Sequence, residues 1–185
     1  MNSLPHFLNF VQKALSTERL TLEPITVAHA EELCELFNDP ELHRFTPQEC
    51  LTLEKQEERC ARWEKRASPD GLELWLNWAA RDKNSKKIIA HLQAGIKSDQ
   101  EASIGYLVAK HFQNKGYATE ALGAVFLYLE EELKVTEVKA WSDTRNLASH
   151  RLAEKMGMVK TEVIKNADFF KGVSSDEFLF LKKFE

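Results

Sequence analysis

The sequence predicts an α/β fold in which helices flank a mixed, mostly antiparallel central sheet, and three observations carry this prediction. Short apolar runs of strand-like pattern stand near the start, in the middle and at the end of the chain. Between them lie segments whose apolar residues recur at helical spacing. In order, the segments are a strand, two helices, three strands, a helix, a strand, a helix and two strands. This order is typical of an α/β sandwich built on a mixed sheet.

The first part of the chain begins with a strand and two helices. Residues 19–26 alternate apolar and polar side chains, which indicates a strand with one buried face. Residues 27–38 carry apolar side chains at helical spacing, and the Asp-Pro pair that follows ends this helix. A second helix, rich in charges of both signs, is predicted over about 51–66 and ends at a Ser-Pro-Asp-Gly turn.

Three strand-like runs occupy the middle of the chain. They cover residues 72–80, 87–96 and 102–109, and two polar turns of hairpin length separate them. The three runs therefore predict an antiparallel meander. Two of the four tryptophans, Trp75 and Trp78, lie in the first of these strands. Because they are three residues apart, their side chains face opposite ways, and at least one of them is expected in the core.

The last part alternates helices and strands. A long helix is predicted over 118–133, a strand over 135–142 and a helix over 147–157 that Gly157 closes. Two further strands, over 158–164 and 176–184, end the chain. One face of the long helix is apolar. Its members are Ala121, Leu122, Val125, Phe126, Leu129 and Leu133.

Length and composition predict a single domain over residues 1–185 in a water-soluble protein. The chain has 185 residues, 43% of them hydrophobic, and a mean hydropathy of −0.41. The net charge is −4 and no basic stripe is present, which disfavours a nucleic-acid partner. No window reaches the ~20 apolar residues of a membrane span, and the first twenty residues make a poor signal peptide. We therefore expect a cytoplasmic protein that does not bind membranes.

The cysteines and histidines carry no metal-binding pattern. Cys34, Cys50 and Cys60 are an odd number, and no pair of them has the spacing of metal ligands. The six histidines are scattered along the chain. The sequence therefore predicts neither a disulfide framework nor a metal site.

The stretch HFQNKGYATEALG, His111–Gly123, joins the last strand of the meander to the long helix. Free backbone N–H groups and the helix dipole make such a helix start a binding site for an anion. Gly116 allows close approach of a pyrophosphate to the backbone. The stretch matches neither the P-loop consensus nor the three-glycine dinucleotide fingerprint.

This stretch resembles the acetyl-CoA-binding core of the GNAT acetyltransferases, whose loop carries Gln or Arg, then Gly, then Gly or Ala. The matching residues are Gln113, Gly116 and Ala118. The IGY motif before the loop, and the N-x-x-S and K-x-G motifs after it, resemble the branch that contains the ribosomal-protein N-terminal acetyltransferases. The opening residues 18–42 are similar to the same branch, so the resemblance covers nearly the whole chain.

The resemblance implies an N-acetyltransferase that uses acetyl-CoA as co-substrate. A primary amine would attack the acetyl group directly, without an acyl-enzyme. A bulge in the strand before the loop would splay it, and its backbone would pair with pantetheine. The implied cofactor-binding residues are Leu107, Val108, Ala109, Gln113, Asn114, Lys115, Gly116, Tyr117, Ala118, Thr119, Asn146 and Ser149. Ser149 would also serve catalysis by giving a proton to the leaving thiolate, and Asn146 would bond the pantetheine arm.

The base that deprotonates the amine is less clearly marked. Many relatives carry a glutamate before IGY, and Ser103 takes that position here. We consider Asp168 first, because it falls where the ribosomal-protein enzymes carry a catalytic glutamate, and Glu101 second. Each of them is equally well explained as a carboxylate in a polar loop. An α-amino group of pKa about 8 needs a weaker base than a lysine of pKa about 10.4.

Several alternatives stay open at this point. The acceptor could be a protein N-terminus, ribosomal or other, which we favour, or a small amine such as a polyamine or an aminoglycoside. Loss of the glutamate before IGY would also suit a non-catalytic acyl-CoA-binding regulator, and a plain interaction domain ranks last. Trp63, Trp75, Trp78 and Trp141 are candidates to line an acceptor groove. Acceptor contacts are expected from the first two helices and a loop after Ile164, and a homodimer is open because relatives are often dimers.

Overall fold

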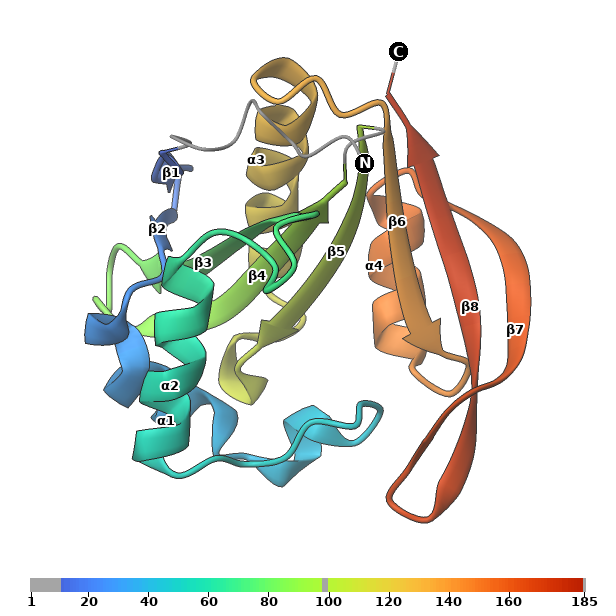
Figure 1. The fold of residues 1–185 in the computed structure, drawn as a ribbon, viewed down its shortest axis with the longest axis horizontal. Helices are drawn as coiled ribbons and strands as arrows, with labels where there is room; N and C mark the ends of the chain where they lie inside the picture. Colours follow the sequence, from blue (N-terminus) through green and yellow to red (C-terminus); the bar gives the residue numbers. More distant parts are fainter. Residues whose placement is uncertain (1–10, 98–99, 185) are drawn as a thin grey trace.

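The computed structural model describes residues 11–97 and 100–184 (Figure 1). The first ten of the twenty residues considered as a signal peptide, and part of the turn predicted after residue 96, lie outside these ranges. The described strands form one sheet of eight, in the order β1-β2-β3-β4-β5-β6-β8-β7. Their bounds are β1 Leu15–Ser16, β2 Leu20–Pro24, β3 Leu74–Asp82, β4 Ile88–Ile96, β5 Glu101–Val108, β6 Glu137–Asp143, β7 Val159–Phe170 and β8 Val173–Lys183.

Among the described strands, β5 and β6 are the one parallel pair, and all other neighbours run antiparallel. Two helices lie on each face of the sheet (Figure 1). Helices α1 (Ala30–Phe37) and α2 (Leu53–Glu64) cover one face, and α3 (Tyr117–Glu131) and α4 (Leu147–Lys155) cover the other. The predicted α/β fold with a mixed, mostly antiparallel sheet is thus confirmed.

The sequence pattern missed a few short elements and one extension. The short elements are strand β1 and three 3-10 turns, η1 Val27–His29, η2 Pro40–His43 and η3 Lys110–Phe112. The segment after Ile164 was expected to be a loop, but β7 continues through it to Phe170. Its pairing with β8 is irregular between Lys160 and Glu162 and again between Ile164 and Asp168, but it resumes from Asp168↔Ser175 to Phe170↔Val173. The result is a long β7–β8 arm that projects beyond the other strands (Figure 1).

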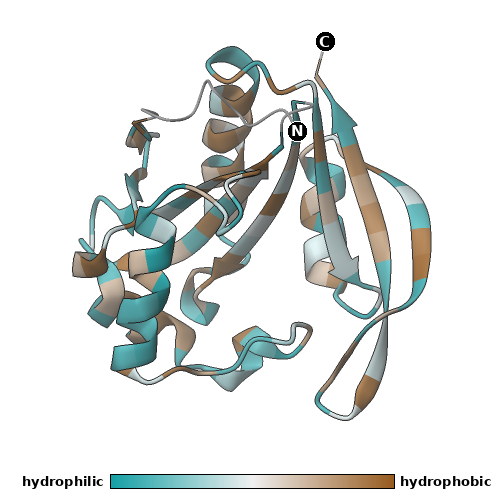
Figure 2. Cartoon of the chain, viewed as in Figure 1, coloured by the Kyte–Doolittle hydropathy of each residue, from teal (hydrophilic) through white to brown (hydrophobic). Residues whose placement is uncertain are grey.

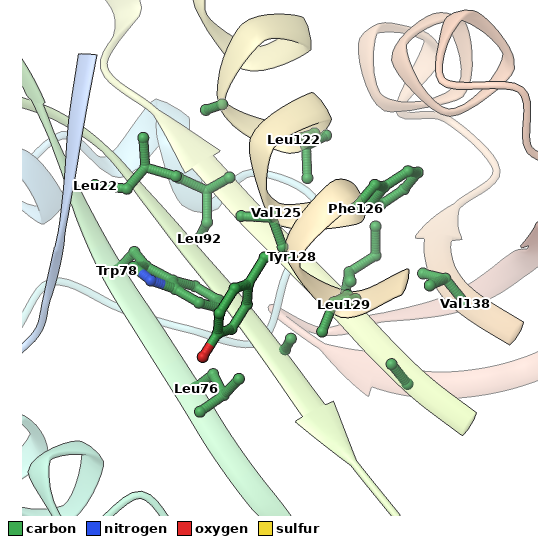
Figure 3. Packing of buried hydrophobic residues seen from close by; sticks show 14 of the residues in the cluster. Leu22, Leu76, Trp78, Leu92, Leu122, Val125, Phe126, Tyr128, Leu129 and Val138 are labelled. Carbon is green, nitrogen blue, oxygen red and sulfur yellow. The ribbon is translucent and has the colours of Figure 1, made fainter. Parts of the chain in front are cut away.

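The larger core lies between the sheet and α3. Trp78 is fully buried there, and its ring meets the Tyr128 ring edge-on with 6.0 Å between centroids (Figure 3). The predicted apolar face of α3 supplies most of the helix side of this core. Trp78 is therefore a core residue, which rules it out as a lining of an acceptor groove. Full burial of such a side chain is worth about 1.5–3 kcal/mol.

A smaller core joins α1 and α2 to the opposite face of the sheet. Leu33 and Phe37 from α1 and Cys60 from α2 pack there against Ala79 and Ile88. Helix α2 is mostly hydrophilic, whereas α3 carries many hydrophobic residues (Figure 2). The difference follows from position, because α2 presents more of its surface to solvent.

Candidate active site

The feature that defines the site is a split between β5 and β6. The two strands pair at three positions, Glu101↔Glu137, Ala102↔Val138 and Ser103↔Lys139. Beyond Ser103 they diverge, and the V-shaped opening is visible in Figure 1. The rest of β5 has therefore lost its β6 partner and has backbone groups to offer to a ligand.

The pairing of β5 with β4 shows which backbone groups these are. The amide of Ala109 donates to the carbonyl of Ile89 at 2.8 Å, and Lys97 donates to the carbonyl of Glu101 at 3.1 Å. Antiparallel strands direct the polar groups of alternate residues to opposite sides. The odd-numbered residues of β5 therefore bond to β4, and the N–H and C=O groups of Tyr106 and Val108 point toward the split.

The expected bulge is not present in the β4–β5 ladder. One unbroken register runs from Ala90↔Val108 to Ile96↔Ala102. The two strands therefore diverge without a bulge in β5. Of the three strand residues assigned to the cofactor, Val108 thus directs its backbone to the split, and Leu107 and Ala109 direct theirs to β4.

The loop between η3 and α3 forms the lower boundary of the split. Gln113 Nε2 donates to the carbonyl of Val108 at 2.9 Å and so ties the loop to the end of β5. Asn114 and Gly116 both have left-handed backbone, with φ of 58° and 82°. The first bond of the helix ladder is from Glu120 N–H to the Gly116 carbonyl, at 3.0 Å. The amides of Tyr117 to Thr119 come before this first bond, so they have no carbonyl partner within the helix. Gly116 has no side chain that could cap them.

Arg19 lies at this helix start, and the sequence pattern did not reveal it. Its guanidinium donates to the Lys115 carbonyl at 3.0 Å and stands 4.2 Å from the centre of the Tyr117 ring. A methyl group added to Gly116 would lie 3.4 Å from Arg19 Nη2. Glu120 holds the guanidinium through an ion pair of 2.6 Å to Arg19 Nε. A fixed cation therefore accompanies the free amides.

On the other side of the split, Tyr106 and Ser149 meet. Asn146 caps α4 by accepting from the Ser149 amide at 3.2 Å, as an ordinary N-cap does. Ser149 Oγ lies 2.8 Å from the Tyr106 hydroxyl, which joins α4 to β5. Burial raises the pKa of Tyr106, so its hydroxyl stays protonated at neutral pH. Sequence reasoning missed Tyr106, although it is the tyrosine of the IGY motif.

The two candidate bases lie apart. Glu101 accepts from Lys139 Nζ at 2.5 Å at the closed end of the split. Asp168 lies in the β7–β8 arm, opposite Ser175. Burial raises the pKa of the nearby Glu177, and the carboxylates of Asp168 and Asp143 add to the effect. No spacing in the sequence marked Glu177, because its acidic neighbours Asp143 and Asp168 come from two other strands, β6 and β7.

Asp143 anchors the end of β6 beside this group. It accepts from Ser175 Oγ at 2.7 Å and from Arg145 Nε at 2.8 Å, and Arg145 lowers its pKa to about 2. The tip of the arm is held as well, because Lys171 Nζ donates to the carbonyl of His43 in η2. The arm and the η2 segment therefore enclose the face of the sheet on which an acceptor would lie.

A pocket of about 260 Å³ opens on this same face. Its lining residues are Trp63, Glu73, Trp75, Asn77, Gln93, Ala94, Gly95 and Ser103. Trp63 and Trp75 thus line a hollow as the sequence suggested, and Trp141 on β6 is 43% exposed.

Two features bear on metals and membranes. Within residues 11–97 and 100–184, no group of three or more His, Cys, Asp or Glu side chains could hold a metal ion. In the same ranges, no helix combines the length and apolar character that crossing a membrane requires.

Comparison with known proteins identifies the class to which this site belongs. Residues 19–159 match the family described as the acetyltransferase (GNAT) domain. The N-acetyltransferase YoaA of Bacillus subtilis (strain 168) is 28% identical over 165 residues, which are 88% of this chain and 92% of the relative. The protein is therefore an N-acetyltransferase, one of the acyltransferases. It belongs to the GNAT family.

Solved structures agree on the fold. The ribosomal-protein-S5-alanine acetyltransferase of Vibrio fischeri has a TM-score of 0.82 at 20% identity and covers 93% of this chain and 97% of its own. The microcin C7 self-immunity acetyltransferase MccE, solved with acetyl-CoA and AMP, has a TM-score of 0.79 at 21% identity and covers 90% of this chain and 93% of its own. GNAT acetyltransferases use acetyl-CoA as the acetyl donor.

Proposed function

We propose that this chain, as one domain, transfers the acetyl group of acetyl-CoA to the α-amino group of a protein N-terminus in a ternary complex. The observation that carries the proposal is the split between β5 and β6. It offers unpaired strand backbone above a helix start with free amides, as an extended pantetheine and its pyrophosphate would need.

The pyrophosphate would bind the amides between Gln113 and Thr119, with Arg19 and Lys115 as nearby cations. Negative charge at a helix start is favourable because it meets free N–H groups and the positive end of the helix dipole. The pantetheine would pair with Tyr106 and Val108, whose backbone points to the split. The side-chain amide of Asn146 would bond it from α4.

The chemistry would proceed in one attack. The neutral amine adds to the thioester carbonyl, the C–N bond forms and the carbonyl oxygen becomes an oxyanion that a backbone N–H of β5 stabilises. The base takes the surplus proton from the attached nitrogen, and the oxyanion collapses to the amide carbonyl as the C–S bond breaks. The CoA thiolate takes a proton from Tyr106 or Ser149, which share a hydrogen bond of 2.8 Å and regain a proton from solvent. A thiol of pKa about 8.5 is a good leaving group for this step.

Asp168 is our first choice of base and Glu101 the second. The ion pair with Lys139 occupies the Glu101 carboxylate and favours Asp168. Asp168 lies in the arm that encloses the acceptor face, with Glu177 beside it. An α-amine of pKa about 8 is about a tenth neutral at pH 7, so a weak base is sufficient.

A protein N-terminus is favoured as acceptor because relatives of the same fold act on ribosomal proteins, as the name of the Vibrio fischeri enzyme states. A polyamine or aminoglycoside would need the same cofactor site. A non-catalytic acyl-CoA-binding regulator would keep the split but would lack turnover.

The test uses a peptide with a free N-terminus and one internal lysine, together with acetyl-CoA. A copy of the peptide blocked at its N-terminus is the control, and spermidine and an aminoglycoside are compared. We expect one acetyl group on the α-amine of the free peptide and none on the blocked copy, with one thiol released per acetyl group. Acetylation of spermidine or the aminoglycoside alone would overturn the proposed acceptor. Acetyl-CoA binding without any turnover would favour the regulator.

A further inference from the structure

We propose that the pocket beside Ser103, called here the tryptophan pocket, binds the ammonium group of the acceptor, with Glu73 as its anionic partner. The pocket is the hollow of about 260 Å³ lined by Trp63, Glu73, Trp75 and their neighbours. This inference rests on the proposed function, because it names the part of the site that would receive the amine. It assigns Glu73 a role in binding. For an amine in this pocket, Glu101 is the candidate base within reach, because it lies two residues from Ser103 on the same face of β5. Asp168 pairs with Ser175, six residues along β8 from the Leu181 that lies level with Lys139 and Ser103.

The position of the pocket is the first argument. Ser103 lines it, and Ser103 is also the last residue of β5 that pairs with β6. The pocket therefore borders the closed end of the split. Its lining side chains on β5 and β4 project from the sheet face that carries α1 and α2, opposite to Tyr106 and Ser149. An amine there would approach from one face of the sheet, and the thiol would leave on the other.

Gly95 brings the carboxylate of Glu73 close to Ser103. A Cβ atom at position 95 would lie 2.9 Å from Ser103 Oγ and 3.6 Å from Glu73 Oε2. Because Gly95 has no side chain, Ser103 Oγ and Glu73 Oε2 can both lie over the Gly95 backbone. Glu73, which immediately precedes β3, therefore brings a carboxylate to this point from the other side of β4.

The aromatic and polar lining suits a cation. Trp75 Nε1 donates to Glu73 Oε2 at 3.0 Å and so orients the carboxylate. Indole rings attract cations, and the effect grows where water is excluded. Gln93 contributes an amide group that can accept a hydrogen bond, whereas the Asn77 amide oxygen lies 3.0 Å from His91 Nε2. Pockets for drug-sized ligands measure about 300–1,000 Å³, so this one would hold a compact charged end and not a whole acceptor.

The neighbouring cations do not fill the pocket. Lys97 Nζ lies 3.8 Å from Glu73 Oε1, but its side chain is 62% exposed. Arg59 lies against the rings of Phe37 and Trp63 on the α2 side. His91 stacks on Trp63 and is neutral, because burial lowers its pKa to about 3.

The test is an NMR titration of the full chain with its tryptophan indoles labelled with nitrogen-15. Butylammonium, which is fully charged at pH 7, is the probe, and 1-butanol is its uncharged match. We expect the Trp75 indole signal, assigned with Trp75→Phe, to move with butylammonium and to stay in place with butanol. Glu73→Gln should weaken the affinity for butylammonium, read from the Trp75 indole signal, at least tenfold. Lys97→Gln should strengthen that affinity.

The control is Glu154→Gln, which removes one exposed carboxylate from α4 on the opposite face and should leave the response unchanged. The proposal is overturned if butylammonium leaves the Trp75 signal in place or if Glu73→Gln responds like the wild type. Acetyl-CoA binding, measured by calorimetry on the same samples, reports on the proposed function separately. Its absence beside an intact butylammonium response would contradict the proposed function and still support the pocket.

Discussion

At the scale of single residues, the contact between Tyr106 and Ser149 carries most of the proposed acid chemistry. Their hydroxyl oxygens are 2.8 Å apart, and they come from a strand and a helix that otherwise flank the split. Removing a proton donor of this kind typically costs 10²–10⁴-fold in rate. We expect Tyr106→Phe or Ser149→Ala to lower kcat roughly tenfold to a hundredfold, because each leaves one hydroxyl to serve in place of the pair.

The measurement is kcat at saturating acetyl-CoA, with acetyl-CoA affinity as the control for folding. The double variant Tyr106→Phe with Ser149→Ala should lose more than either single variant. Unchanged kcat in the double variant would contradict a role for both hydroxyls in proton transfer.

His91 makes a second residue-scale prediction, about stability. Burial lowers its pKa to about 3, against about 6.5 when exposed. Between pH 6.5 and 3 the unfolded chain binds a proton at His91 and the folded chain does not. The contribution of neutral His91 to the free energy of unfolding is therefore full above pH 6.5 and is lost as the pH drops toward 3. One such proton changes the free energy of unfolding by about 1.4 kcal/mol per pH unit.

Urea unfolding of the wild type and of His91→Gln at pH 7, 6, 5 and 4 measures this contribution, because other groups titrate equally in both proteins. We expect the wild type to lose stability faster than the variant between pH 6 and 4, by up to about 1.4 kcal/mol per unit. Parallel curves for the two proteins would mean that His91 is charged or exposed in the folded state.

At the scale of elements, the start of α3 depends on Arg19 from the segment before β2. Arg19 is paired with Glu120 and touches Lys115 and Tyr117. Arg19→Ala would leave the Glu120 carboxylate unpaired beside the proposed pyrophosphate site. We expect acetyl-CoA affinity to fall about tenfold, because a charge-assisted hydrogen bond to the pyrophosphate would be lost.

Lys13→Ala is the matched control, because Lys13 forms an ion pair of 2.6 Å with Glu132 at the other end of α3. It should leave acetyl-CoA affinity unchanged in calorimetry. Equal losses in the two variants would show that α3 was destabilised and that Arg19 has no particular effect at the helix start.

The elements also show what the sequence could predict. Apolar periodicity predicted α1, α3 and the central strands, because each of them buries one face. A charged segment that ends at a turn predicted α2, and a segment closed by Gly157 predicted α4. It failed at β7, where polar residues such as Lys165 and Asn166 follow Ile164. Pairing with β8 across the short turn at Lys171 and Gly172 holds that segment as a strand, although its polar residues show no apolar alternation that would reveal it.

At the scale of the whole molecule, the motifs predicted the cofactor loop, and the tertiary fold brings the other residues of the candidate site together. The sequence predicted Gly116 and Asn146 as helix-start residues, because the first position of a helix favours a few residue types. Arg19, Glu73 and Tyr106 reach the site from segments far apart in the chain, so spacing alone could not assemble them. The sequence also could not show that β5 has no bulge, because the pairing of a strand depends on the neighbouring strands.

The central claim is that acetyl-CoA binds in the split, with its pyrophosphate at the start of α3. Calorimetric titration of acetyl-CoA into the wild type and Gly116→Trp tests it most directly, because the indole would fill the pyrophosphate space. Gly172→Trp is the matched control, since both glycines have positive φ, 82° and 75°, and Gly172 lies in the β7–β8 turn. We predict micromolar binding to the wild type and to Gly172→Trp, and none to Gly116→Trp. No binding to the wild type, or equal binding to all three proteins, would contradict the account.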